Sequence, residues 1–175
     1  MSVQSARAQA DFLTSQFDIE SVPVDVEAIA QALGLAIVRA NLGNEVSGML
    51  VTNKGRSYVC VHERHHPVRQ RFTIAHEIGH HVLGHQLESG DHVHIDHGNF
   101  ISQRGPRAST GLDPKEIEAN QFAAALLMPV TLVRQATTDV AGKSPLLDSH
   151  VELLADRFRV SQQAMTIRLT TLGLL

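Results

Sequence analysis

The segment from Pro67 to His85 constrains the fold more than any other part of this sequence. Proline is tolerated in the first turn of a helix, and apolar side chains follow it at helical spacing. A helix with so much apolar surface is expected to be buried. Its middle nevertheless carries His76-Glu77-Ile78-Gly79-His80, and polar side chains are costly to bury without a partner. The chain must therefore fold around this helix and give its histidines a role.

The motif has the form H-E-x-x-H, which predicts a zinc site. Side chains four residues apart lie on one face of a helix, so His76 and His80 can reach the same ion. Glu77 lies one step further round, where it can act on a water instead of binding the metal. A catalytic zinc takes three protein ligands and keeps one position open. The sequence thus predicts bound Zn²⁺ with a third ligand from elsewhere, and the apolar context disfavours a chance match.

A second helix, which begins at Asp113-Pro114, offers that ligand. Glu116 and Asn120 are four residues apart and share a face. Glu116 could bind the ion, and Asn120 could hydrogen-bond the free ring nitrogen of a ligand histidine, which is a usual support for such ligands. Glu116 also fits a capping box that begins at Asp113, where it would serve only the start of the helix.

Other candidates for the third ligand stay open. Glu118 is a rival, pointing about 200° away around the same helix. The chain has 11 histidines, and all but His150 lie between His62 and His97. The histidine candidates outside the motif are His92, His94 and His97, which we expect in a solvated loop. His81 and His85 occupy another face of the motif helix, and we expect them to shape the cleft at its end.

The composition suits one ordinary globular domain of 175 residues with 43% hydrophobic content. The net charge of -3 gives no reason to expect nucleic acid as a partner. Cys60 is the only cysteine, so neither an intrachain disulfide nor a cysteine zinc cluster can form. The first residues lack an apolar signal region, and no apolar run is long enough to span a bilayer. We therefore expect a cytoplasmic protein without membrane contact.

The remaining patterns predict an α+β fold, a small antiparallel sheet packed on helices. Helices are expected over residues 5–17 and 25–33, and strands over 36–38, 48–52 and 58–61, the last two forming a hairpin. Residues 86–112 are expected as a long loop with a candidate strand at 99–103. The helix from Asp113 should stop at Pro129, and a helical pair should follow Pro145. We assign residues 1–140 to a metallopeptidase domain and 141–175 to this C-terminal pair, docked on the same core.

Together these residues resemble the ImmA/IrrE family of metallopeptidases. The matching stretches are Arg71–His80 and Glu116–Pro129, with further similarity at Val22–Ala30 and Leu154–Ser161. The resemblance covers nearly the whole chain. It implies a thermolysin-like zinc core of bacterial, phage or mobile-element origin, and cleavage of a DNA-binding repressor, often of the Xre helix-turn-helix type. It also implies that the family's zinc ligands are His76, His80 and Glu116.

The expected activity is that of a zinc endopeptidase with Glu77 as general base. The donor that stabilises the oxyanion stays open between Tyr58 and a histidine or arginine of residues 92–104. One alternative is a DNA-binding regulator, because residues 150–172 loosely resemble a helix-turn-helix. Its recognition helix would offer only Arg168 as a cation. Another alternative is a zinc-stabilised toxin-antitoxin component without turnover, which would have no need of Glu77.

Overall fold

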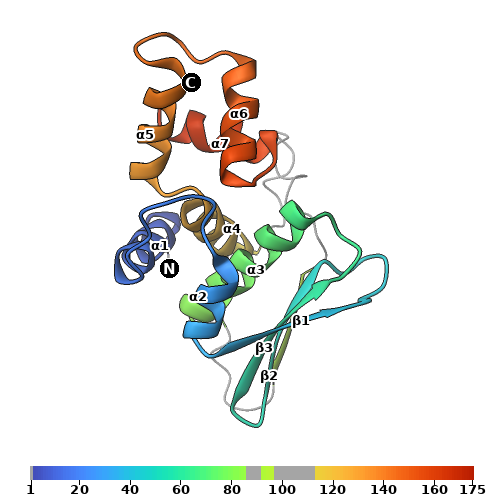
Figure 1. The fold of residues 1–175 in the computed structure, drawn as a ribbon. Helices are drawn as coiled ribbons and strands as arrows, with labels where there is room; N and C mark the ends of the chain where they lie inside the picture. The colour runs from blue at the N-terminus through green and yellow to red at the C-terminus, as the bar shows by residue number, and fades with distance from the viewer. Residues whose placement is uncertain (1, 86–91, 97–112) are drawn as a thin grey trace.

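The computed structural model describes residues 2–85, 92–96 and 113–175 (Figure 1). The described part confirms the α+β class and contains these elements in chain order: α1 (Val3–Gln16), α2 (Val26–Ala32), β1 (Leu35–Ala40), β2 (Gly48–Asn53), β3 (Arg56–His62), α3 (Pro67–Val82), β4 (His92–Asp96), α4 (Pro114–Leu127), α5 (Val130–Ala141), α6 (Asp148–Phe158) and α7 (Gln162–Thr171). In Figure 1, the sheet lies at one end of the molecule and α5, α6 and α7 lie at the other.

The sheet has the strand order β1-β3-β2-β4. The expected hairpin is present, with β2 and β3 antiparallel, and β2 also pairs antiparallel with β4. Unlike the antiparallel sheet expected, β1 runs parallel to β3. β1 and β2 run in opposite directions. β3 follows β2 through the hairpin turn and lies between β1 and β2 in the sheet. The sheet is therefore mixed.

β4 corrects the expectation of a continuous loop over residues 86–112. Val93 and Ile95 are exposed, whereas Asp96 is buried and His94 is partly buried. The strand alternates between two faces as a strand must, but its inward residues are polar, so the usual apolar signal is missing. The candidate strand at 99–103 lies outside the described residues.

α5 was also not expected. Pro129 ends α4 as predicted, but the same proline is the N-cap of α5, with φ -56° and ψ 136°. Proline lacks a backbone N–H donor, but the first N–H groups of a helix have no partner within the helix in any case. A residue that stops one helix can therefore open the next.

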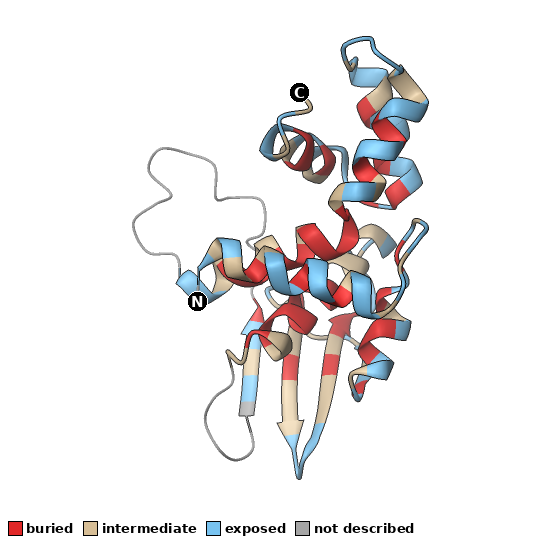
Figure 2. Cartoon of the chain, turned by 90° about the vertical axis from the view of Figure 1, so that its left-hand side faces the viewer, coloured by how far each residue is buried: buried red, intermediate tan, exposed pale blue. Residues whose placement is uncertain are grey.

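α3 lies at the centre of the core. Every residue from Thr73 to His80 is buried, and the helix contacts α4, α2, β2 and β3. Figure 2 shows buried residues concentrated where the helices meet one another and the sheet, while the hairpin tip is exposed. The sequence-based expectation of a buried motif helix is confirmed.

A glycine allows α3 and α4 to lie close together. A Cβ atom at Gly79 would lie 3.1 Å from Cδ1 of Phe122 and 3.3 Å from Cα of Ala119. The second neighbour is backbone, which cannot rotate away. Gly79 thus allows a close approach of the two helices, and this approach brings α4 to the motif.

The C-terminal helices complete the same hydrophobic core, to which Leu154, Phe158, Met165 and Leu169 all belong. The Ser161 hydroxyl accepts a hydrogen bond from the backbone N–H of Ala164 at 3.1 Å and so caps the start of α7.

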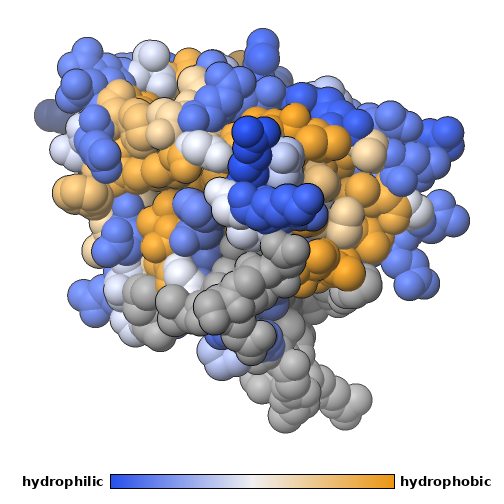
Figure 3. All heavy atoms as spheres, turned by 90° about the horizontal axis from the view of Figure 1, so that it is seen from below, coloured by the Kyte–Doolittle hydropathy of each residue, from blue (hydrophilic) through white to orange (hydrophobic). Residues whose placement is uncertain are grey.

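Away from the core, some apolar side chains reach the surface. Val38, Val93 and Ile95 on the sheet are exposed. The view from below shows apolar surface between hydrophilic side chains (Figure 3). Among the described residues, no helix is both long enough and apolar enough to cross a membrane.

Candidate metal centre

α3 holds the two motif histidines one turn apart. Nε2 of His76 lies 3.0 Å from Nε2 of His80, and both side chains are buried. Because the two ring nitrogens face each other, their lone pairs converge on one point. This is the arrangement that the spacing of four residues predicts.

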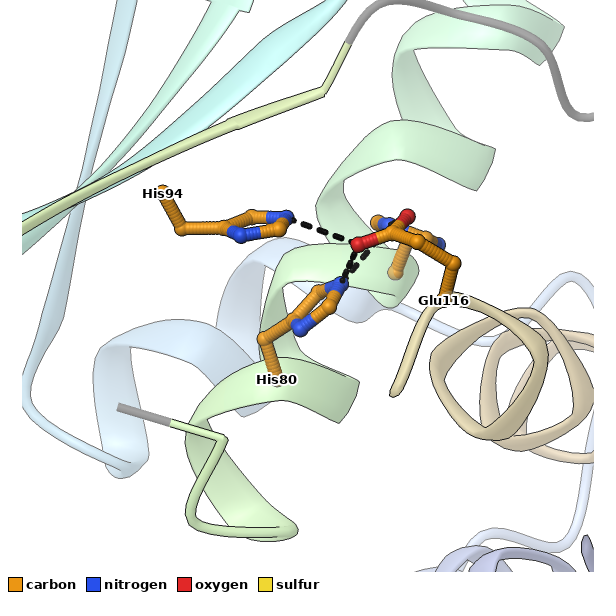
Figure 4. Close-up of side chains that lie close together, drawn as sticks. His80, His94 and Glu116 are labelled. Atoms are coloured by element: carbon orange, nitrogen blue, oxygen red, sulfur yellow. Dashed lines mark hydrogen bonds and ion pairs between the residues drawn. The ribbon is translucent and has the colours of Figure 1, made fainter. Parts of the chain in front are cut away.

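α4 brings a carboxylate to the same point. The Asp113 side chain caps this helix by accepting from the backbone N–H of Lys115 at 2.9 Å, which leaves Glu116 in the first turn. Oε2 of Glu116 lies 3.3 Å from Nε2 of His76, and Oε1 lies 3.3 Å from Nε2 of His80. The structure therefore turns Glu116 towards the histidines, and Asp113 provides the side-chain cap (Figure 4).

Asn120 lies behind His76, one turn along α4. Its Oδ1 lies 3.0 Å from Nδ1 of His76. A carbonyl oxygen only accepts, so this contact places the ring proton on Nδ1 and leaves Nε2 with a free lone pair. The contact has the form of the support expected for Asn120.

Glu118, the rival carboxylate, lies elsewhere. Its Oε2 is 3.1 Å from Nε2 of His85, and Nδ1 of His85 is 2.9 Å from Nδ1 of His80. Glu118 is thus linked to the site through His85, which contacts the far side of the His80 ring as Asn120 contacts that of His76. From the sequence, His85 was expected on another face of the helix from His76 and His80, with a role only in shaping the cleft.

His94 adds a third imidazole from the sheet. Its Nε2 lies 3.2 Å from Oε1 of Glu116, and its ring centroid is 3.9 Å from that of His80 (Figure 4). The sequence analysis expected His94 in a solvated loop, and the structure corrects this. The alternation of His92, His94 and Asp96 was the signal that could have identified it.

The four side chains His76, His80, His94 and Glu116 form one cluster that could hold a metal ion. Each offers one donor atom, and these atoms all lie within 4.8 Å of one another. His97 and residues 97–104, named earlier as candidates, lie outside the described residues. Tyr58 lies on β3 as predicted and is partly buried.

Burial and neighbouring groups put His80 and Glu116 in the ionisation states that metals require. Burial lowers the pKa of His80 to about 4, so its imidazole is neutral near pH 7. Burial alone would raise the pKa of Glu116, but the nitrogens of His76, His80 and His94 outweigh it and hold that pKa well below its usual range. Neutral imidazole and ionised carboxylate are the forms that bind metal.

Comparison with known proteins agrees with this site. The family model described as the IrrE N-terminal-like domain, Peptidase_M78, matches residues 30–170. The chain belongs to this family. The match includes α3, β4 and α4, which together carry every member of the cluster.

The fold of this Peptidase_M78 member is similar to that of a Mycobacterium tuberculosis transcriptional regulator, with a TM-score of 0.62 and 17% sequence identity. The similarity covers 95% of this chain but 47% of the regulator, so the chain spans about half of that protein's length. A search of curated proteins gave no match.

Glu77 shows that the residues present fit a catalytic metal, as the family implies. Its side chain is fully buried, and neither carboxylate oxygen has a hydrogen-bond partner within the described residues. Buried polar atoms are rarely left in this state unless they have a function. Three imidazoles and a carboxylate also suit zinc. A carboxylate with free lone pairs beside such a donor set is arranged to act on a water.

Gly48 on β2 provides the space for this carboxylate. A Cβ atom there would lie 3.1 Å from Oε1 of Glu77 and would overlap Cγ2 of Thr73 at 2.2 Å. Burial, followed by the charges of Asp96 and Glu116, raises the pKa of Glu77 well above its ordinary value. A raised pKa makes a carboxylate a stronger base near neutral pH.

Proposed function

We propose that this chain is a zinc-dependent endopeptidase that acts on a protein substrate. The observation that carries the proposal is the position of Glu77. Its side chain is buried and has no hydrogen-bond partner among the described residues, and it lies close enough to Glu116 for that charge to raise its pKa. A site that only held a structural ion would have no use for a buried carboxylate left unpaired.

The residues divide the chemistry between them. His76, His80 and Glu116 would hold zinc, with Asn120 orienting His76. When bound, zinc polarises a carbonyl group and makes water more acidic. Glu77 accepts a proton from the attacking water and later donates it to the leaving amine. The raised pKa of Glu77 suits both steps, because a group that is too acidic would not return the proton.

For the substrate, we propose a DNA-binding repressor of the Xre helix-turn-helix type. The support is the resemblance to the ImmA/IrrE family and the similarity of fold to a transcriptional regulator. Cleavage of a repressor would link this chain to transcription without requiring it to bind DNA.

Direct DNA binding through α6 and α7 is the weaker proposal. Arg168, the only cation on α7, is 5% exposed, and its Nε donates to the backbone carbonyl of Met128 at 3.0 Å. A recognition helix needs cations that reach phosphates. Arg168 is instead engaged in joining α7 to the end of α4.

Co-expression with candidate Xre-type repressors tests the proposal. The wild type should cleave its substrate, and Glu77→Gln should abolish cleavage while retaining bound metal, because the amide cannot accept the proton. Glu45→Gln makes the same chemical change at an exposed position and should cleave as the wild type does. Cleavage by Glu77→Gln at the wild-type rate would show that Glu77 is not the base.

A further inference from the structure

The donor set contains one ligand more than a hydrolytic zinc site uses. Catalytic zinc has three protein ligands and an open position, whereas four protein ligands close the site. His76, His80 and Glu116 already make three. His94 comes from β4, on the opposite side of the cluster from α4, and supplies a fourth donor.

The geometry places the His94 ring within reach of an ion held by the other three side chains. Tetrahedral zinc with bonds of about 2.0–2.1 Å sets its ligand atoms about 3.3 Å apart. Nε2 of His94 lies 3.2 Å from Oε1 of Glu116, which matches the 3.3 Å contacts of Glu116 with His76 and His80. This same Nε2 is buried and makes no well-aligned hydrogen bond within the described residues. Nε2 of His94 therefore lies at the distance expected between two zinc ligands. Its lone pair or proton has no well-aligned partner within the described residues.

A role for His94 as the oxyanion donor fits this geometry less well. Such a donor lies about 2.7–3.1 Å from the oxygen that develops charge, and this oxygen occupies the position opposite the protein ligands. Nε2 of His94 lies against the carboxylate of Glu116 itself. At this position the His94 ring occupies the space that a water or a substrate carbonyl group would need.

The strand that carries His94 is suited to release it. β4 is at the edge of the described sheet and pairs there with β2, with His94 opposite Leu50. The donors from α3 and α4 belong to helices that pack tightly across Gly79. A shift of β4 needs to disturb one strand pairing, whereas a shift of His76 or Glu116 would disturb the core.

We infer that His94 is a removable fourth ligand that closes the metal site in the resting protein, so that hydrolysis requires its release. The ligand role stands on the geometry alone, whereas the latent activity rests on the proposed function. The protein would be held inactive until a substrate or partner draws His94 away.

Cobalt substitution tests the ligand role without relying on cleavage. The full chain is loaded with Co²⁺, and its visible spectrum is followed during titration with acetohydroxamate, which needs an open coordination position. The wild-type spectrum should resist the titration, whereas the spectra of His94→Ala and His94→Gln should shift. Zinc affinity, measured against a chelator, should fall by more than about 100-fold in both variants, because loss of a side chain that only supports a ligand costs about 10–100-fold.

Ile95→Ala, on the same strand, and His81→Ala, next to His80 in sequence, are the matched controls and should behave as the wild type. Equal zinc affinity and equal response to acetohydroxamate in the wild type and both His94 variants would overturn the ligand role.

Where a substrate is cleaved, His94→Ala should cleave it faster than the wild type, and slower cleavage would overturn the latency. If no variant cleaves any substrate, the proposed peptidase function fails, and the cobalt spectra still decide the role of His94.

Discussion

Each cluster histidine of α3 has a hydrogen-bonding partner at its Nδ1 atom. Asn120 contacts Nδ1 of His76, and His85, itself in contact with Glu118, contacts Nδ1 of His80. These contacts fix the tautomer and the ring orientation before any metal binds. Asn120, His85 and Glu118 thus hold the two imidazoles in place, and the cost of ordering these rings is met during folding.

Asn120→Ala should lower zinc affinity by about 10–100-fold, because His76 loses the acceptor that holds its ring. Asn120→Asp keeps an acceptor at the same place and should retain most of the affinity. Chelator titration of the two variants measures this difference. Equal losses in both would show that packing at this position matters and the hydrogen bond does not.

At the scale of the elements, the site depends on how closely α4 approaches α3. The point of closest approach is Gly79, against Ala119 and Phe122. Glu116 and Asn120 lie on either side of Ala119 along α4. Any displacement of α4 therefore moves Glu116, the proposed metal ligand, together with Asn120, which contacts His76.

Gly79→Val should destabilise the fold by roughly 1–3 kcal/mol, the usual cost of overpacking a well-filled core. It should also weaken zinc binding, because the added side chain pushes Glu116 away from His76. Thermal unfolding with and without zinc measures both effects. Unfolding and zinc affinity equal to the wild type would contradict the close packing of the two helices.

The sequence predicted the helical elements of the site better than its strand. The H-E-x-x-H motif and the Asp113-Pro114 start were readable, because helix signals are local in the chain. β4 was missed because it is short and mostly polar, and the apolar residues of its alternation, Val93 and Ile95, are the exposed ones. The approach of His94 to Glu116 depends on the pairing of β4 with β2, a contact between segments distant in the sequence that no local pattern contains.

At the scale of the whole molecule, both ends of the chain support α4. The guanidinium of Arg7 on α1 donates to Oε1 of Gln121 at 3.0 and 2.7 Å. At the other end, Arg168 on α7 donates to the carbonyl of Met128, directly after α4. The helix that supplies Glu116 is thus held from two sides by segments at opposite ends of the sequence.

Arg168→Ala should lower the free energy of unfolding by about 1–3 kcal/mol, because the carbonyl of Met128 loses a buried partner. Arg157→Ala is the control, since Arg157 pairs with Asp139 at the surface, and exposed pairs contribute about 0–1 kcal/mol. Denaturant unfolding compares the two variants. An equal, small effect of both would show that α7 does not brace α4.

Zinc stoichiometry tests the central claim most directly. Elemental analysis after zinc loading and removal of excess metal should find about one zinc per chain in the wild type, as a single cluster of His76, His80, His94 and Glu116 predicts. Glu77→Gln should retain that zinc, Glu116→Ala should lose most of it, and Glu118→Ala should keep it. Absence of stoichiometric zinc from the loaded wild type would contradict the account, as would full retention by Glu116→Ala combined with loss from Glu118→Ala.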